Sequence, residues 1–216
     1  ALRNILLDFA EGKLDILVGT QMVAKGHDFP NVTLVGVLAA DAGLSFPDFR
    51  SAERTFQLLT QVAGRAGRGE VPGQVIIQSF YPEHYAIRCA RNQDYAAFYR
   101  QEIEFRSLMG YPPFKGLVQL LVSDADSTRA FQVGDKVGAA LKRAVRETPS
   151  SSHVRVLGPA AAPLEKLRGK YRVQVLVKAD TTRDALPILK QAFTYLGEHK
   201  VALKNILVDV DPLSLL

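Results

Sequence analysis

The chain has 216 residues, of which 47% are hydrophobic and 23% are charged. This balance is ordinary for folded globular protein and excludes a disordered chain, and the length suits two domains of about 100 residues that each bury a core. No apolar run approaches the roughly 18 residues of a membrane span, and no leader-like segment opens the chain. We therefore expect a cytoplasmic protein without a membrane partner.

The chain begins at Ala1, directly in a helix-like stretch over residues 3–9, which suggests that it was cut from a longer polypeptide. Its single cysteine, Cys89, forms neither an internal disulfide nor a cysteine-rich zinc site. We interpret Cys89 as a packing residue in a protein of a reducing compartment.

The net charge of +5 is unevenly distributed along the chain. Residues 1–106 contain 11 Lys and Arg against 12 Asp and Glu, whereas residues 107–216 contain 16 against 10. A basic domain concentrates polyanions near its surface, so the second half indicates a nucleic acid or an acidic peptide as partner. Ribosomal or merely solubilising charge is the alternative.

The first half alternates apolar runs with helical periodicity. Residues 14–19 and 33–38 are nearly continuous apolar runs bounded by Gly, Pro and Asn, a pattern typical of strands buried on both faces. A third run covers 75–78. Residues 51–66 have apolar side chains at helical spacing, with Ser51 as a candidate N-cap. Strands alternating with helices predict an α/β fold with a parallel sheet.

Residues 94–108 predict an amphipathic helix, which the segment 110–113 (Gly-Tyr-Pro-Pro) ends. We place the domain boundary there, giving domains 1–110 and 111–216. The second domain predicts strands at 116–123, 153–157, 171–178 and 203–210 and helices at 127–147 and 181–197. The resulting order, β-α-β-β-α-β, is the ferredoxin-like plan of an α+β domain. Residues 158–168, rich in Pro, predict a long functional loop.

A glycine-rich segment, residues 61–69 (Gln-Val-Ala-Gly-Arg-Ala-Gly-Arg-Gly), places Arg65 and Arg68 three residues apart at a predicted helix end. Their planar guanidinium groups would meet a phosphate beside backbone that a ligand can approach closely. Cations placed where charge develops on a transferring γ-phosphoryl group act as arginine fingers. A solvated turn is the alternative interpretation.

A second polar segment, residues 19–30, follows a predicted buried strand. Ligands of an open α/β sheet gather at the carboxyl ends of its strands, so Thr20 and Gln21 would emerge at a ligand site. The alternative is a hydrogen-bonded loop in which Thr20 caps a helix. For His27 we favour a structural role, because nothing pairs it with a nucleophile or a metal cluster.

Together the two segments resemble motifs V and VI of superfamily-two helicases, whose final motif reads Gln-x-x-Gly-Arg-x-Gly-Arg. The wording of residues 15–28, 48–68, 111–114 and 209–212 extends the resemblance along the whole chain to the PriA family of replication-restart helicases, also called primosomal protein N-prime. The resemblance implies that residues 1–110 are part of a RecA-like second helicase lobe, and that the chain is a C-terminal fragment.

The resemblance also implies roles for single residues. The implied roles are catalytic for Gln61, Arg65 and Arg68, nucleotide-facing for Gly26, Asp28 and Gly64, and DNA-contacting for Thr20 and Gln21. It implies ATP and Mg²⁺ in the full-length protein, and a zinc module whose cysteine ligands this chain lacks, so we expect no metal here. The chain contains neither Gly-x-x-x-x-Gly-Lys-Ser/Thr nor Asp-Glu-x-His. Alone it is expected not to hydrolyse ATP.

Residues 166–172 (Lys-Leu-Arg-Gly-Lys-Tyr-Arg) set four cations around one aromatic ring. Cations neutralise phosphates and a ring stacks on an unpaired base. The segment therefore predicts contact with single-stranded or branched DNA through Lys166, Arg168, Lys170, Tyr171 and Arg172. The alternative is a strand with solvated alternate residues.

The resembled family associates this domain with branched DNA and with the acidic, hydrophobic C-terminal tail of single-stranded DNA-binding protein, for which Arg183 is the candidate contact. The preferred hypothesis is thus a 3′ to 5′ DNA helicase that recognises stalled forks and initiates primosome assembly with other primosome proteins, at the bacterial nucleoid. The rival is a non-enzymatic module that binds nucleic acid or a protein tail on an α/β scaffold.

Overall fold

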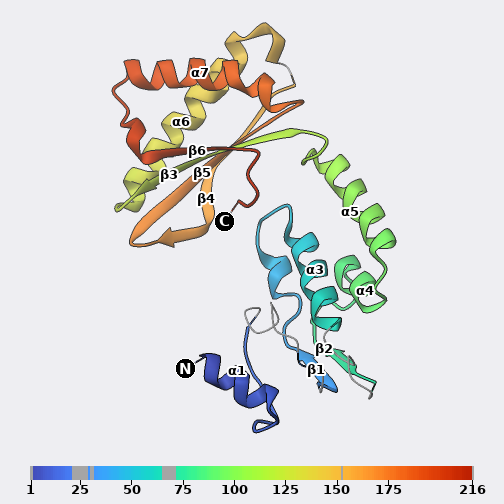
Figure 1. Cartoon of the computed structure of the whole chain (residues 1–216). Coiled ribbons are helices and arrows are strands. Elements are labelled where there is room, and N and C mark those ends of the chain that lie inside the picture. Colours follow the sequence, from blue (N-terminus) through green and yellow to red (C-terminus); the bar gives the residue numbers. More distant parts are fainter. Residues whose placement is uncertain (1, 21–28, 30–31, 65–71, 152, 216) are drawn as a thin grey trace. The chain divides into compact units, whose positions relative to one another are not determined.

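The computed structural model describes residues 2–20, 29, 32–64, 72–151 and 153–215 (Figure 1). Their contacts form two compact units. The lobe unit comprises residues 1–45 and 51–101, and the C-terminal unit comprises residues 46–50 and 102–216. The C-terminal unit therefore includes five residues from the first half of the chain, which we call the strap (Phe46–Arg50). The division into domains at residue 110 stays a prediction.

The lobe unit is an α/β structure. Its elements are α1 (Leu2–Ala10), β1 (Leu34–Val37), the short 3-10 helix η1 (Ala42–Ser45), α3 (Ser51–Ala63), β2 (Gln74–Ile77), α4 (Tyr85–Arg91) and the first part of α5 (Tyr95–Met109). Strands β1 and β2 pair in parallel, with Leu34 opposite Gln74 and Val37 opposite Ile77. The predicted α/β class and parallel pairing are confirmed.

Two predictions about these strands are wrong. Residues 14–19 form no strand, and Val18 is 88% exposed. A strand requires a neighbour to pair with its backbone, and the described sheet of this unit contains only β1 and β2. These two strands are also not buried on both faces, since Leu34 and Ile76 are exposed in an alternating pattern.

The core of the lobe unit is built by one face of α3 against α4 and α5. Phe56 and Leu59 of α3 are buried, and the ring of Phe56 stacks on Phe98 with centroids 4.1 Å apart. Cys89 of α4 is buried in the same cluster, so its interpretation as a packing residue is confirmed. Helix α4 itself was not predicted.

The C-terminal unit has the ferredoxin-like plan that its periodicity predicts. Its elements after α5 are β3 (Gly116–Asp124), α6 (Ser127–Glu147), η2 (Pro149–Ser151), β4 (Arg155–Leu167), β5 (Lys170–Ala179), α7 (Thr182–Glu198), η3 (Leu203–Asn205) and β6 (Ile206–Val210). The strands form an antiparallel sheet in the order β4-β5-β3-β6. Helices α6 and α7 both pack on one face of it (Figure 1).

That face holds the main core. Val118 of β3 lies opposite Val177 of β5, and these side chains are fully buried beneath the helices. Small residues let α6 approach closely: a Cβ at Gly134 would come 2.6 Å from Cγ1 of Val173. The alternation of Val173, Val175 and Val177 towards this core is the pattern expected for a half-buried strand.

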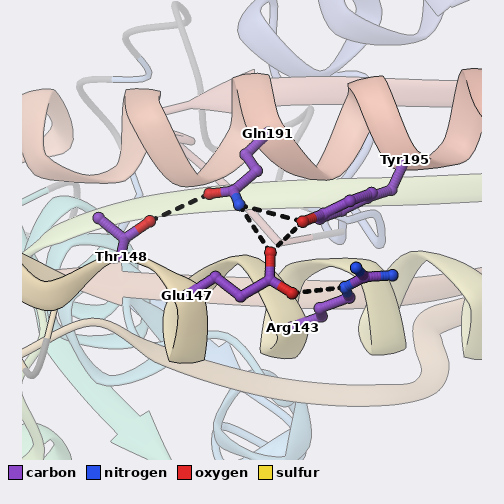
Figure 2. Close-up of polar contacts among 5 residues, drawn as sticks. All are labelled: Arg143, Glu147, Thr148, Gln191 and Tyr195. Carbon is purple, nitrogen blue, oxygen red and sulfur yellow. Dashed lines mark hydrogen bonds and ion pairs between the residues drawn. The ribbon is translucent and has the colours of Figure 1, made fainter.

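The outer side of α6 is joined to α7 by a polar network (Figure 2). The carboxylate of Glu147 accepts hydrogen bonds from the Tyr195 hydroxyl, from Nε of Arg143 at 2.7 Å and from Nε2 of Gln191 at 2.9 Å. The Thr148 hydroxyl donates to Oε1 of Gln191 at 3.1 Å. The Tyr195 hydroxyl, then Arg143, hold the pKa of Glu147 below its ordinary value, so Glu147 is a carboxylate at neutral pH and accepts hydrogen bonds from both helices.

The prediction of a functional loop at 158–168 is wrong. These residues form most of β4 and a tight hairpin turn, in which Arg168 and Gly169 adopt positive φ angles of 51° and 80°. The pairing of β4 with β5 shifts register between Leu157 and Ala160 and again between Ala161 and Lys166. Pro lacks an N–H, and such irregularities of an edge strand accommodate Pro159 and Pro163.

Candidate nucleotide and nucleic-acid sites

The first candidate site is the end of α3. The buried side of this helix fixes its orientation on the lobe core, which leaves Gln61 exposed. Gly64 follows, and its N–H donates to the Thr60 carbonyl at 3.1 Å. Among the described residues, a Cβ at Gly64 would meet only ordinary contacts of 3.6 Å or more, and Gly64 is exposed. Arg65 and Arg68 lie outside the described residues.

The segment that matches motif V is only partly described. Thr20 is exposed at the end of an irregular stretch. Gln21, Gly26 and Asp28 lie outside the described residues, as does His27. Their predicted roles therefore rest on the sequence pattern.

The carboxyl ends of β1 and β2 carry a polar contact that sequence reasoning missed. Asp41 is buried beyond β1, and its Oδ1 accepts the N–H of Phe80 at 3.0 Å. The Ser79 hydroxyl, then the Phe80 N–H, lower the pKa of Asp41, which is therefore a carboxylate at neutral pH. Asp41 joins the loops that follow the two strands.

Beside Asp41 lies a cavity of about 530 Å³. Its lining residues are Asp41, Leu44, Ser45 and the segment 80–84. Phe80 and Tyr81 are largely exposed at its rim. The signal that could have located it is a polar residue shortly after each of two parallel strands, because open α/β sheets bind ligands at that edge.

The second candidate site is the tip of the β4–β5 hairpin. Lys166 near the end of β4, Arg168 in the turn and Lys170 at the start of β5 are all exposed, with Lys166 opposite Tyr171 in the ladder. Three exposed cations within five residues form a compact positive tip, a suitable surface for phosphate groups.

The other two residues of the predicted cluster, Tyr171 and Arg172, make contacts within the C-terminal unit. The Lys166 ammonium lies 4.6 Å from the Tyr171 ring centroid and donates to its hydroxyl at 3.3 Å, and the half-buried ring packs on the main core. Arg172 is only 8% exposed and donates to the Leu164 carbonyl at 3.5 Å. The structure thus brings three cations together at the tip and turns Arg172 into the opposite face of the sheet.

Arg183 lies on the first turn of α7 and is exposed. A capping box between Thr181 and Asp184 fixes this helix start. Among the described residues no group of three or more His, Cys, Asp or Glu side chains is placed to hold a metal ion. None of the described helices is both long and apolar enough to cross a bilayer.

Two family models match the chain. The helicase conserved C-terminal domain matches residues 2–70, and the primosomal protein N C-terminal domain matches residues 107–213. The chain therefore belongs to a class of proteins in which a helicase C-terminal domain is followed by a primosomal C-terminal domain.

Curated relatives named replication restart protein PriA match almost the whole chain. Over 96% of its own length the chain is 43% identical to the protein of Bacillus subtilis (strain 168). Over 98% of its own length it is 40% identical to that of Chlamydia pneumoniae. It is 40% identical over 99% of its length to the protein of Synechocystis sp.. These alignments cover 25%, 27% and 24% of the relatives, so the chain spans about a quarter of their length. The chain belongs to the PriA family.

Proposed function

We propose that this chain supplies part of the second motor lobe and the DNA-docking domain of an ATP-dependent 3′ to 5′ DNA helicase. In this proposal the intact protein recognises stalled or branched forks and initiates primosome assembly in the bacterial cytoplasm, at the nucleoid. The observation that carries the proposal is the Gln-x-x-Gly-Arg-x-Gly-Arg motif, which begins on the last turn of a packed helix, in a chain 43% identical to a replication restart protein.

The residues fit a nucleotide held mainly by another lobe. Gln61 on the last turn of α3 and Gly64 just after it are both exposed, which supports a position facing a phosphate group. ATP with Mg²⁺ would supply the phosphoryl group, and Arg65 and Arg68 would stabilise charge on it. The phosphate-cradling motif is not in this chain, so we propose that the chain alone does not hydrolyse ATP.

Zinc does not fit the residues of this chain. Its one cysteine, Cys89, is buried in an apolar cluster, and the described residues contain no group of metal ligands. No step of the proposed function passes through a zinc ion.

The motor role is tested by Arg65→Ala and Arg68→Ala in the intact protein. Removing a cation that stabilises the transition state costs about 100-fold or more in kcat, so DNA-stimulated ATP hydrolysis should fall by that amount. Arg100→Ala is the matched control, because Arg100 is exposed on α5 of the same unit. Unimpaired hydrolysis in the Arg65 and Arg68 variants would favour the rival, a non-enzymatic binding module.

The DNA-docking role rests on the cationic hairpin tip, formed by Lys166, Arg168 and Lys170. Each lost phosphate contact lowers the slope of log K against log salt by about 0.7–0.9, so replacing all three residues by Glu should weaken binding of forked DNA and flatten its salt dependence. Lys190→Glu, at an exposed position on α7, is the control. An unchanged slope in the triple variant would contradict the DNA contact.

A protein partner is proposed for the start of α7. The exposed Arg183 is a candidate contact for the acidic, hydrophobic tail of single-stranded DNA-binding protein. Arg183→Glu should weaken binding of a peptide with that tail sequence at least tenfold, since a like charge would face the acidic tail. Titration by fluorescence anisotropy measures the effect, and equal affinity would exclude Arg183 from the contact.

A further inference from the structure

The cavity beside Asp41 belongs to the lobe unit alone. It is lined by residues of η1 and of the loop 78–84, which joins β2 to α4, and every lining residue is within that unit. Its volume of about 530 Å³ is that of a site for a small ligand or a single inserted side chain, since such sites measure about 300–1,000 Å³. Leu44 of η1 packs on the lobe core and so fixes one wall. The motor and DNA roles proposed above assign nothing to this cavity.

Hydrogen bonds hold the loop that forms the other wall. Oδ1 of Asp41 accepts the N–H of Phe80 at 3.0 Å, which joins the loop to the residues that follow β1. The N–H of Tyr81 donates to Oγ of Ser79 at 2.9 Å, and the Tyr81 carbonyl accepts the N–H of His84 at 3.0 Å. The loop is therefore ordered before a ligand arrives, which lowers the entropic cost of binding.

Two aromatic rings of this loop are exposed at the rim of the cavity. Phe80 is 78% exposed and Tyr81 is 67% exposed, whereas Phe56 and Phe98 of the core of the same unit are each 4% exposed. A single exposed apolar side chain is ordinary, but two adjacent large rings on an ordered loop beside a cavity form a surface suited to a partner. The faces of such rings carry partial negative charge and attract cations.

The charged residues that line the cavity are acidic. Asp41 is a carboxylate at neutral pH, and Glu83 is exposed. His84 contributes a neutral ring, because its Nδ1 accepts the N–H of Ala86 at 3.2 Å and therefore carries no proton. Among the described residues of the lining there is no Lys or Arg. The two carboxylates repel a phosphate group, and together with the exposed rings they favour a cation.

From this arrangement we propose that the cavity binds an arginine side chain on a basic segment of a partner protein. A guanidinium group stacks on aromatic faces and donates paired N–H groups to a carboxylate, so Phe80, Tyr81 and Glu83 supply both kinds of contact. The partner is a protein because a nucleic acid would bring its phosphates towards two carboxylates. The inference concerns the lobe unit alone and does not rest on the motor and DNA roles proposed above.

The test uses the intact protein and a peptide blocked at both ends, Gly-Gly-Arg-Gly-Gly, with saturation-transfer NMR as the measurement. One guanidinium group held by cation–π and ionic contacts at an open cavity binds weakly, so we expect a Kd on the order of 1–10 mM. The same peptide with citrulline in place of arginine has the shape of the side chain without its charge. It should bind at least about fivefold more weakly, because both the cation–π and the ionic contacts are lost.

Variants at the rim locate the binding site. Phe80→Ala removes a largely exposed ring and Glu83→Gln removes an exposed charge, so neither change disturbs the core of the unit. Each should raise the Kd for the arginine peptide by a factor of about two to five, and the double variant should raise it by about tenfold. Tyr99→Ala is the control, because Tyr99 is 51% exposed on α5 of the same unit and does not line the cavity. Its Kd should equal that of the parent.

Three results would overturn the inference. The first is equal affinity of the intact protein for the arginine and citrulline peptides, or no saturable binding of either below about 50 mM. The second is a double variant of Phe80 and Glu83 that binds the arginine peptide as tightly as the parent. The third is weaker binding of a single-stranded oligothymidylate by Phe80→Ala, measured by fluorescence anisotropy, with unchanged binding of the arginine peptide. That result would assign the ring to an unpaired base instead.

Discussion

Phe49→Ala tests whether the strap contributes to the C-terminal unit as much as its contacts indicate. Phe49 is 6% exposed, and a Phe side chain that is almost fully buried removes on the order of 200 Å² from water. At about 25 cal/mol per Å² this area corresponds to about 5 kcal/mol, which is an upper bound because the unfolded chain is partly compact. Replacements of buried Phe by Ala cost about 3–5 kcal/mol, so we expect the unit to lose about that much.

The measurement is native-state hydrogen exchange of amides in β3 and β5, which reports the opening of this unit separately from the lobe unit. Protected amides should exchange faster by a factor corresponding to about 3–5 kcal/mol. Phe131→Ala is the control, because Phe131 is 37% exposed on α6 of the same unit. A loss below about 1 kcal/mol would refute the assignment of the strap to this unit.

Three other predictions concern the C-terminal unit. Gly116→Ala should destabilise the unit by about 1–3 kcal/mol, because the new Cβ would overlap the Thr182 backbone. Gly197→Ala lies in a helix with open space around it and should stabilise the unit by up to about 1 kcal/mol. Urea unfolding measures both changes. Gly169→Ala has room for its Cβ but places Ala at a φ of 80°, so a loss of about 1–2 kcal/mol is expected in the same assay, and no loss would show that the turn relaxes. The lowered pKa of Glu147 means that its contribution is complete above its ordinary value of 4.5 and is lost as the pH falls below it. Melting curves of Glu147→Gln and the parent should therefore differ at about pH 7 and converge as the pH falls through the lowered pKa, and a constant difference would contradict the ionised network.

The sequence predicts the elements whose signal is local. Alternation at Val173, Val175 and Val177 predicts a strand with one face on a core, and the structure pairs that strand with β3 in the expected fold. The periodicity of residues 51–66 likewise predicts α3, which the structure describes to Ala63. Each of these signals depends only on residues within one element, so no knowledge of the partner is required.

The predictions that failed concern features that depend on residues far apart in the sequence. The run at 14–19 has the composition of a buried strand, but a strand forms only where a neighbour pairs with it. Prolines at 159 and 163 predict a loop, whereas the structure places both in β4. The register shifts that accommodate them are set by pairing with β5, which the local sequence does not reveal. The contact of Asp48 with Leu215 spans 167 residues, and no local sequence pattern predicts it.

That separation has a consequence for how the protein is made. During synthesis at about 5–20 residues per second, Asp48 leaves the ribosome roughly 10–30 s before Leu215. The two ends of the contact therefore meet only after the whole chain between them has been translated. Folding of the C-terminal unit, although most of its residues are contiguous, therefore ends with a contact between its first-translated residues, Phe46–Arg50, and its last.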